Sequence, residues 1–443
     1  MLLLPLFSHL IYFIWLQGCR RRSGRYRLPD YAFVSVVVFY DVGLFAEILG
    51  VRLDGHLPSV SMYSVSIQLG TCAAIALTPW LIEIGYRIAA GSMPMQRFRV
   101  MRVPVRRLPG FIFAVLAFSA LGGYFALPLL SSSTLWAART AVGETLGPFA
   151  ILLYLPLYAL AFVVQAGRVP WSLRVGIVIG AVSVAAISTM PLGQRTLVLL
   201  PVVLVLASNA ILAGRLSRLA TAGLLLATGA AILLPYFKWQ HAEANSTLSL
   251  LLAVVTSDLS RANVLSDVLN RAAALGPTSV PFLGSGYVYS LLFFVPRNLA
   301  PFKGSATAIW YTGDVLGIRP DSLTWGFGIG MVEESVLNFG LAMAPIALCC
   351  YGAALRLLER LSIKYRTTFI PSALAAIWLC GYHLPAIFML FGGMIAVCIF
   401  FEHLFADRFG GKAELPHIGK LRGIETLNPA PGAERRSNGA CQL

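Results

Sequence analysis

Several stretches of this chain are apolar over a length that matches the thickness of a membrane. Gly110–Leu130 is interrupted only by small or aromatic residues, and Val175–Met190 contains no charged residue. A helix of about 20 apolar residues spans the hydrocarbon core of a bilayer. Membrane β-strands would instead alternate in polarity over segments of about ten residues, and these runs do not alternate. They therefore predict an all-α polytopic membrane protein.

The composition supports this prediction and limits the functions to consider. Hydrophobic residues make up 58% of the 443 residues and charged residues only 12%, whereas soluble domains carry about 25% charged residues. The net charge of +15 is explained by topology, because Lys and Arg are retained on the cytoplasmic side of membrane proteins. No basic and aromatic module stands apart from the apolar runs, so we expect no nucleic-acid partner.

Clusters of basic residues orient the predicted spans. Arg20–Arg22, Arg97–Arg107 and Arg356–Arg366 each follow an odd-numbered span, which places these loops in the cytoplasm. Phe369–Phe401 must cross the membrane twice, with a break near Gly381–Pro385, to bring the C-terminus inside. The sequence thus predicts about 11 transmembrane helices, a periplasmic N-terminus and a cytoplasmic C-terminus.

The predicted spans divide the chain into four regions. Residues 1–237 hold spans one to eight, 238–335 form one large periplasmic loop with membrane-apposed segments, 336–403 hold spans nine to eleven, and 404–443 form a cytoplasmic tail. Walker-type phosphate loops are missing from all four. The large loop is therefore the place where we expect chemistry.

Cations on the predicted outer face point to an anionic substrate. Arg297 and Lys303 lie in a proline-containing stretch that follows an apolar segment of the loop. Two cations near the lipid surface suit a diphosphate, because Arg offers forked hydrogen bonds and Lys a point charge. Arg195 is the only charge in a five-residue outer turn, where a simple helix-end anchor is an equally good interpretation. Arg139, in the preceding outer loop, is a weaker candidate of the same kind.

Acidic residues at the spans supply candidates for proton transfer. Glu334 lies at the outer end of span nine, with Asn338 one helical turn later on the same face. A carboxyl group partly removed from water there can act as a general base toward a hydroxyl, although pairing with an outer arginine is an equally good interpretation. Asp41, Glu47 and Glu83 are further candidates, because charged residues inside membranes usually serve a function.

The remaining charges of the loop are expected to form local ion pairs. These residues are Arg271, Asp314, Arg319 and Asp321. His383, at the predicted break in the last apolar stretch, is interpreted as a polar hinge residue. The outer face shows no pair of carboxylates at metal-binding spacing, so we expect no metal and no cofactor.

Three short motifs follow one another in and after the large loop. Leu283–Tyr287 contains Gly-x-x-Tyr, Phe294–Lys303 contains Pro-Arg-x-x-x-Pro-x-Lys, and Glu334–Gly340 reads Glu-x-x-x-Asn-Phe-Gly. Together they resemble the Wzy-like oligosaccharide repeat-unit polymerases, the O-antigen polymerase family. Gly193–Thr196 lies where that family carries a Gly-Ser-Arg-Gly-like turn. This chain departs from the family at Ala300, where an aromatic residue often precedes the proline.

The resemblance implies a glycosyltransferase of the bacterial inner membrane. The donor would be a growing glycan on undecaprenyl diphosphate and the acceptor one repeat unit on the same lipid, giving O-antigen, capsule or exopolysaccharide. The implied partners are these lipid-linked oligosaccharides, the membrane lipid, a chain-length regulator and a flippase. The catalytic candidates are Arg297, Arg195 and Glu334, and the substrate-binding candidates are Arg139, Lys303, Asn338 and Tyr287.

Two other functions remain open from the sequence. An O-antigen ligase would use the same leaving group and transfer the glycan to lipid A core; such enzymes place a histidine in the large outer loop, and His241 lies at its start. A transporter or flippase of lipid-linked sugars would line a central cavity with cations. This chain concentrates its conspicuous cations at the predicted outer face instead.

Overall fold

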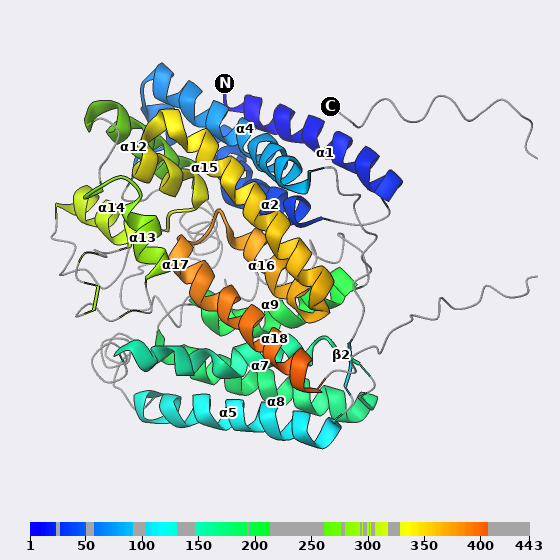
Figure 1. Ribbon diagram of the computed structural model, residues 1–443. Coiled ribbons are helices and arrows are strands. Elements are labelled where there is room, and N and C mark those ends of the chain that lie inside the picture. The colour runs from blue at the N-terminus through cyan, green and yellow to red at the C-terminus, as the bar shows by residue number, and fades with distance from the viewer. Residues whose placement is uncertain are drawn as a thin grey trace, which may run out of the picture. The chain divides into compact units, whose positions relative to one another are not determined.

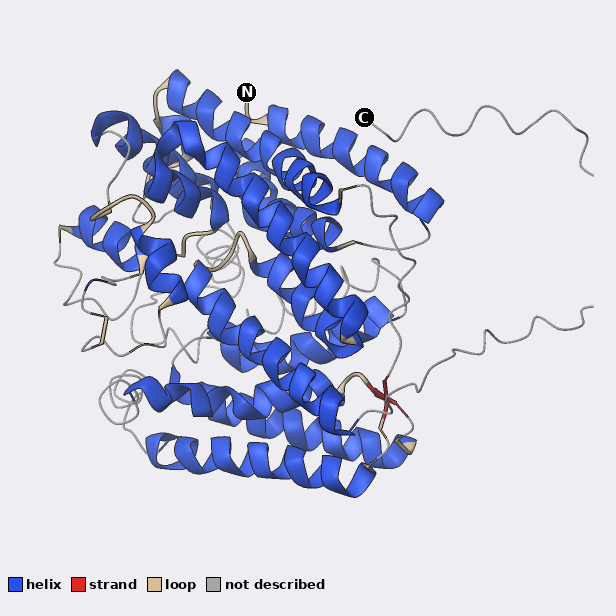
Figure 2. Cartoon of the chain, viewed as in Figure 1, coloured by secondary structure: helices blue, strands red, loops and turns tan. Residues whose placement is uncertain are grey.

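The computed structural model confirms that the chain is helical. It describes residues 1–23, 27–49, 57–91, 103–105, 107–130, 147–167, 169–192, 195–212, 261–275, 280–292, 295, 299–300, 302, 306–317 and 328–405. Within these ranges the only strands are a parallel pair of two residues each, β1 (Val103–Pro104) and β2 (Ala166–Gly167) (Figure 2). The predicted fold class, an α-helical polytopic membrane protein, is supported.

Six helices of the described residues are long and apolar enough to cross a bilayer. They are Leu28–Ile48 (α2 Leu28–Val36, η1 Val37–Asp41 and α3 Val42–Ile48), α4 (Val65–Ala90), α5 (Leu108–Leu130), α8 (Trp171–Thr189), α15 (Met331–Lys364) and Leu384–Phe405 (α17 Leu384–Ile387, η9 Phe388–Gly392 and α18 Gly393–Phe405). Other helices at predicted spans are α1 (Leu3–Ser23), α7 (Leu155–Val163) after η4 (Gly147–Tyr154), α9 (Arg195–Leu212) and α16 (Phe369–Trp378). Predicted span eight, near 219–237, lies outside the described residues, so the count of eleven stays a prediction.

Helices α4 and α15 pack along each other (Figure 1). The crossing depends on two small residues: a Cβ added at Gly85 would overlap the backbone of Cys349, and one added at Gly352 would overlap the carbonyl of Ile82. Small residues let membrane helices approach closely enough for backbone contact. This close crossing joins an early helix of the chain to a late one.

Replacing Gly352 with valine is expected to separate these two helices. Overpacking usually costs about 1–3 kcal/mol and more where backbone must move, so we expect a loss of about 3 kcal/mol in the free energy of unfolding. Thermal unfolding in detergent measures the change. Gly180→Val in α8 is the matched control, because an added Cβ there meets nothing within 4 Å; equal destabilisation by both variants would contradict the packing argument.

A second set of helices packs around α7. Helices α5, α7 and α8 lie side by side, and α18 also packs against α7 (Figure 1). Gly122 of α5 allows Pro156 of α7 to approach, because an added Cβ would overlap the proline ring. The Tyr158 hydroxyl of α7 donates to the Met389 carbonyl at 2.6 Å. Helix α16 packs against α2 and α15 and so connects this set to the α4–α15 pair.

Helix α1 is attached through a buried His–Asp pair. His9 Nδ1 lies 2.6 Å from Asp41 Oδ2, and His9 Nε2 lies 3.0 Å from the carbonyl oxygen of Ile75 in α4. A carbonyl only accepts, so Nε2 is the donor to Ile75. Both ring nitrogens of His9 thus have partners, as a buried position between apolar helices requires.

The predicted large loop contains packed helices rather than open chain. Its described residues include α12 (Ala262–Leu275), α13 (Ser285–Leu291) and α14 (Thr307–Leu316), and all three contact α15 (Figure 1). The predicted break in the last apolar stretch is present, since α16 ends at Trp378 and α17 begins at Leu384. The three loop helices and this break meet the first turns of α15, where the candidate site lies.

Candidate functional site

Two adjacent glutamates begin α15, and they have different surroundings. Glu333 is fully buried; it accepts hydrogen bonds from the Tyr40 hydroxyl at 2.8 Å and from the Gly330 amide at 2.9 Å, so it caps the helix. Glu334 is 1% exposed, and its Oε2 accepts the Leu384 amide at 3.0 Å. Its Oε1 has no hydrogen-bond partner among the described residues. Glu334 therefore has one carboxylate oxygen, itself buried, without a partner in the described part of the chain, whereas both oxygens of Glu333 accept hydrogen bonds.

Asn338, one turn after Glu334, forms hydrogen bonds to three segments: α13, the start of α14 and the first turn of α15. Its Nδ2 donates to the Glu334 carbonyl at 2.8 Å and to Thr307 Oγ1 at 3.1 Å. Its Oδ1 accepts the Gly286 amide at 2.8 Å. Asn338 is fully buried, and its side chain binds α13 and the start of α14 to α15. It thus organises the site, whether or not it also touches a substrate.

Gly340 interrupts α15 directly after this turn. Its backbone has φ 72° and ψ 174°, a conformation that favours glycine. An interrupted helix leaves carbonyls without their usual partners, and the carbonyl of Asn338 instead accepts the Gly284 amide at 3.0 Å. Gly284 itself has φ 76° and packs against the Phe339 ring. The Glu-x-x-x-Asn-Phe-Gly and Gly-x-x-Tyr motifs are therefore joined through their backbones.

Tyr287 of α13 contacts residues of α15 near Glu334 and Asn338. Its hydroxyl lies 3.4 Å from Ser335 Oγ and donates to the Tyr351 hydroxyl at 3.1 Å, and its ring centroid lies 5.0 Å from that of Phe339. Burial, followed by the charge of Glu334, raises the pKa of Tyr287, so its phenol stays protonated at neutral pH. Glu334, Asn338 and Tyr287, predicted separately from two motifs, are brought together.

The chain between α16 and α17 packs against the start of α15. The carbonyl of Leu379 accepts the Met331 amide at 2.9 Å, and the Cys380 amide donates to Ser35 Oγ at 2.9 Å. Gly330 is close to this segment, since an added Cβ would overlap the Cys380 carbonyl. The first turn of α15 thus lies directly against the broken helix.

Arg261 is a residue of this region that sequence analysis did not single out. It immediately precedes α12, and its Nη1 donates to the Gly328 carbonyl at 2.8 Å and its Nη2 to the Gly381 carbonyl at 3.4 Å. A Cβ on Gly328 would overlap the guanidinium. The available signal was a basic residue at the start of an amphipathic helix in a loop predicted to lie outside.

The other predicted site residues are not joined to Glu334 by the described structure. Arg195 is the first residue of α9, as predicted, and the structure describes its backbone but not its side chain. Arg139, Arg297 and Lys303 lie outside the described residues, as does His241. Their roles stay predictions. His383 is the residue before α17, and burial lowers its pKa to about 4, so its imidazole is neutral at neutral pH.

Ion pairs explain several charges of the large loop. Arg271 of α12 binds Asp267 at 2.6 Å and also binds Asp314 of α14, and the Tyr311 hydroxyl donates to Asp267 at 2.9 Å. Burial disfavours the charge on Arg271, but the two aspartates outweigh this and raise its pKa. The expected local pairing of Arg271 and Asp314 is confirmed. Arg319 and Asp321 lie outside the described residues.

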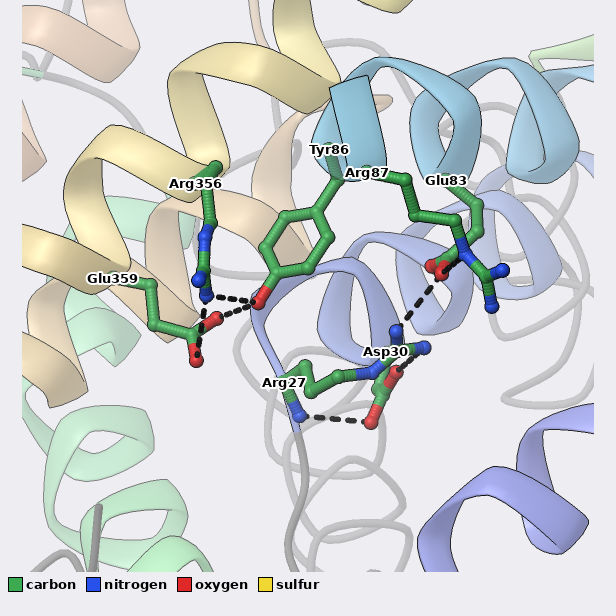
Figure 3. A network of polar contacts seen from close by, with 7 residues as sticks. All are labelled: Arg27, Asp30, Glu83, Tyr86, Arg87, Arg356 and Glu359. Carbon is green, nitrogen blue, oxygen red and sulfur yellow. Dashed lines mark hydrogen bonds and ion pairs between the residues drawn. The ribbon is translucent and has the colours of Figure 1, made fainter. Parts of the chain in front are cut away.

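A larger polar network (Figure 3) includes Arg356 and Glu359 near the Lys364 end of α15, whereas Glu334 lies near its Met331 end. Arg27 binds Glu83 at 2.8 Å and Asp30 at 3.1 Å, and Arg87 also binds Glu83 at 2.8 Å. On α15, Arg356 donates to the Tyr86 hydroxyl at 3.1 Å, and that hydroxyl donates to Glu359. The three arginines balance the three acids in charge. The network connects α2, α4 and α15, and Glu83 serves this packing.

The two other acids near the first spans also have structural partners. Asp41 is held by His9, as described above, and the Glu47 carboxylate accepts the amides of Ser61 and Val60 at 2.7 and 3.3 Å. Glu47 therefore fixes the short turn η2 (Val60–Met62) before α4. Asp41 Oδ1 and Glu83 Oε2 also lack a hydrogen-bond partner among the described residues, as Glu334 Oε1 does. Asp41 is bound by His9, and Glu83 by Arg27 and Arg87, whereas no basic side chain of the described residues binds Glu334.

The described residues contain no group of three or more His, Cys, Asp or Glu that could hold a metal ion. The arrangement around Glu334 contains a buried carboxylate with one oxygen that has no partner among the described residues, beside the Asn338 amide and the hydroxyls of Thr307 and Tyr287. Such a group can accept a proton from a hydroxyl nucleophile or position that nucleophile. Comparison of the chain with known protein families, with characterised proteins and with solved structures gave no match.

Proposed function

We propose that the chain is a membrane glycosyltransferase that polymerises undecaprenyl-diphosphate-linked oligosaccharide repeat units at the periplasmic face of the bacterial inner membrane. The observation that carries the proposal is the convergence of Glu334, Asn338 and Tyr287 on one buried polar site. These residues come from two separate motifs, and both motifs contribute to the family resemblance. A resemblance arising by chance would not require them to meet.

The proposed topology has about eleven spans, with the N-terminus in the periplasm and the C-terminus in the cytoplasm. The Met331 end of α15 then faces the periplasm, where lipid-linked glycans are presented. In this topology the network of Arg27, Glu83 and Arg356, drawn in Figure 3, would lie at the cytoplasmic end. Its basic members agree with the retention of positive charge on that side.

In the proposed reaction, a hydroxyl of the acceptor's terminal sugar attacks the anomeric carbon of the donor glycan. The new carbon–oxygen bond forms as the bond between the anomeric carbon and the diphosphate oxygen breaks. The hydroxyl proton passes to Oε1 of Glu334, and undecaprenyl diphosphate leaves. Arg297, Arg195 and Lys303, with Arg139 behind them, are proposed to neutralise the leaving group.

The two arginines provide a direct test of the leaving-group site. We expect Arg297→Ala and Arg195→Ala each to abolish chain growth, because the departing diphosphate loses charge-assisted hydrogen bonds. Lysine at either position is expected to restore only part of the activity, since it lacks the forked geometry. Glycan ladders and membrane insertion are measured together. Arg271→Gln is the control, as its charge is already paired; wild-type chain lengths in either alanine variant would remove that arginine from the site.

A deletion strain tests the function itself. Loss of a polymerase leaves a single repeat unit attached to the lipid anchor of the surface polysaccharide. Normal ladder lengths in the deletion strain would end the proposal. Unattached glycan would indicate a ligase, and repeat units trapped inside the cell would indicate a flippase.

A transporter of lipid-linked sugars is the second candidate, and one observation favours it. Helix α15 is interrupted at Gly340, and the last apolar stretch is broken between Trp378 and Leu384. Interrupted helices at a polar site are common in transporters. For a transporter we expect the network of Figure 3, which connects α2, α4 and α15, to open during the cycle. Cross-linking α4 to α15 beside Tyr86 would then stop transport, whereas the proposed polymerase is expected to keep its activity.

A further inference from the structure

Arg261 and Glu334 hold the two ends of the same short break between α16 and α17. Arg261 donates to the carbonyl of Gly381 at 3.4 Å, and Glu334 accepts the amide of Leu384 at 3.0 Å. Two residues, Tyr382 and His383, lie between Gly381 and Leu384. Any movement of the break therefore changes the position of the Glu334 carboxylate, because that carboxylate is bound to it.

Arg261 is itself fixed by its backbone and by its second hydrogen bond. Its amide donates to the Phe39 carbonyl in the π-helix η1 at 2.8 Å, and its Nη1 donates to the Gly328 carbonyl at 2.8 Å. Gly328 lies three residues before the start of α15 at Met331. The Arg261 guanidinium thus connects the residues just before α15 to the break between α16 and α17. Glu334, which lies on α15, is hydrogen-bonded to the same break.

Close backbone packing leaves little freedom in this arrangement. A Cβ added at Gly328 would overlap the Arg261 guanidinium, and one added at Gly381 would overlap the Phe39 ring. The same Phe39 supplies the carbonyl for the Arg261 amide. The Arg261 guanidinium, the Phe39 ring and the Gly381–Leu384 break therefore restrict one another's positions. Removal of the guanidinium leaves the carbonyls of Gly328 and Gly381 without this donor.

From these contacts we infer that Arg261 is a positioning residue for Glu334 in the proposed glycosyl transfer. It acts through the Gly381–Leu384 break and does not bind the substrate. This inference rests on the proposed function for its kinetic part, and on the structure alone for its effect on the break. A displacement of a catalytic group by about 1 Å can cost about 100-fold in rate.

The kinetic test uses full-length protein in liposomes with undecaprenyl-diphosphate-linked repeat units. We expect Arg261→Gln to lower kcat for chain extension by about 10- to 100-fold, with KM for the acceptor changed less than about threefold. Arg261→Lys is expected to recover part of the loss, because one amine can reach one of the two carbonyls. Arg271→Gln, an arginine of the same helix with its own aspartates, is the matched control and should keep wild-type kcat.

A variant with both Arg261 and Glu334 replaced distinguishes a positioning role of Arg261 from a direct role in binding or chemistry. If Arg261 acts through Glu334, then Arg261→Gln combined with Glu334→Gln is no slower than Glu334→Gln alone. Multiplied losses, or a rise in KM with kcat unchanged, would overturn the inference, because Arg261 would then contribute to binding or to chemistry by itself.

Deuterium uptake tests the inference without any assumption about the reaction. We expect the peptide covering Gly381–Ile387 to exchange faster in Arg261→Gln than in wild type, and at the wild-type rate in Arg271→Gln. Unchanged exchange in Arg261→Gln would overturn the inference even if wild type polymerises. If wild type extends no chains but exchange rises in Arg261→Gln, the proposed function fails and the positional role of Arg261 stands.

Discussion

Replacing Glu334 with glutamine is expected to lower the rate of chain extension by about 10²- to 10⁴-fold, the range typical for loss of a general base. Glutamine keeps the size of the side chain, and its carbonyl oxygen can still accept the Leu384 amide. It cannot take a proton from the attacking hydroxyl. Extension of a labelled acceptor by purified protein measures the rate, and the unfolding temperature is expected to stay near that of wild type.

Glu333→Gln is the matched control, with the opposite expected result. The Glu333 carboxylate accepts hydrogen bonds from the Tyr40 hydroxyl and the Gly330 amide. The N-terminus of a helix such as α15 stabilises a negative charge. We expect this variant to lose about 1–2 kcal/mol of stability and to keep most of its rate per folded molecule. Wild-type rates in Glu334→Gln, or equal rate losses in both variants, would contradict the distinction between the two carboxylates.

Removal of one partner from the His9–Asp41 pair is expected to have the largest effect on stability. His9→Leu and Asp41→Leu each leave a buried polar group without its partner, and breaking a buried pair costs about 3–5 kcal/mol. Replacing both residues with leucine removes both polar groups and is expected to cost much less than the sum of the two single variants. Unfolding free energies in bicelles measure the double-mutant cycle.

Ser8→Ala is the reference variant for this experiment, because it shows how much the free energy of unfolding falls when one neutral hydrogen bond of α1 is lost. Ser8 precedes His9 in α1, and its hydroxyl donates to the Ala76 carbonyl at 2.9 Å. Loss of this neutral hydrogen bond is expected to cost about 1 kcal/mol. Additive effects of the two His9 and Asp41 single variants, each near the Ser8→Ala value, would contradict a strong interaction between the two side chains.

Much of the helical architecture could be predicted from the sequence, because long apolar runs in lipid have few alternatives to a helix. The run Gly110–Leu130 corresponds to α5 at Leu108–Leu130, and the break near Gly381–Pro385 corresponds to the gap between α16 and α17. Helices α12 to α14 were interpreted as a loop with membrane-apposed segments. They are amphipathic or short, so a search for continuous apolar runs does not detect them.

The candidate site could be predicted only in part. The spacing of Glu334 and Asn338 on one helical face was sufficient to associate them, and a family resemblance added Tyr287. Sequence alone could not separate Glu333 from Glu334, because their roles depend on Tyr40 and Leu384, which lie far away in the chain. For the same reason sequence alone could not show that Arg27, 56 residues earlier in the chain, binds Glu83. The pair of Glu83 with Arg87, four residues later on the same helix, follows a spacing that sequence does reveal.

Extension of glycan chains by the purified protein tests the central claim most directly. The full chain is reconstituted in liposomes with synthetic undecaprenyl-diphosphate-linked repeat units as the only substrate, and the products are separated by size. We expect a ladder of lipid-linked oligosaccharides and release of undecaprenyl diphosphate in equal number to the new linkages, with both products formed about 10²- to 10⁴-fold more slowly by Glu334→Gln. Movement of unextended units across the bilayer, without a ladder or released carrier, would contradict the polymerase and support a transporter.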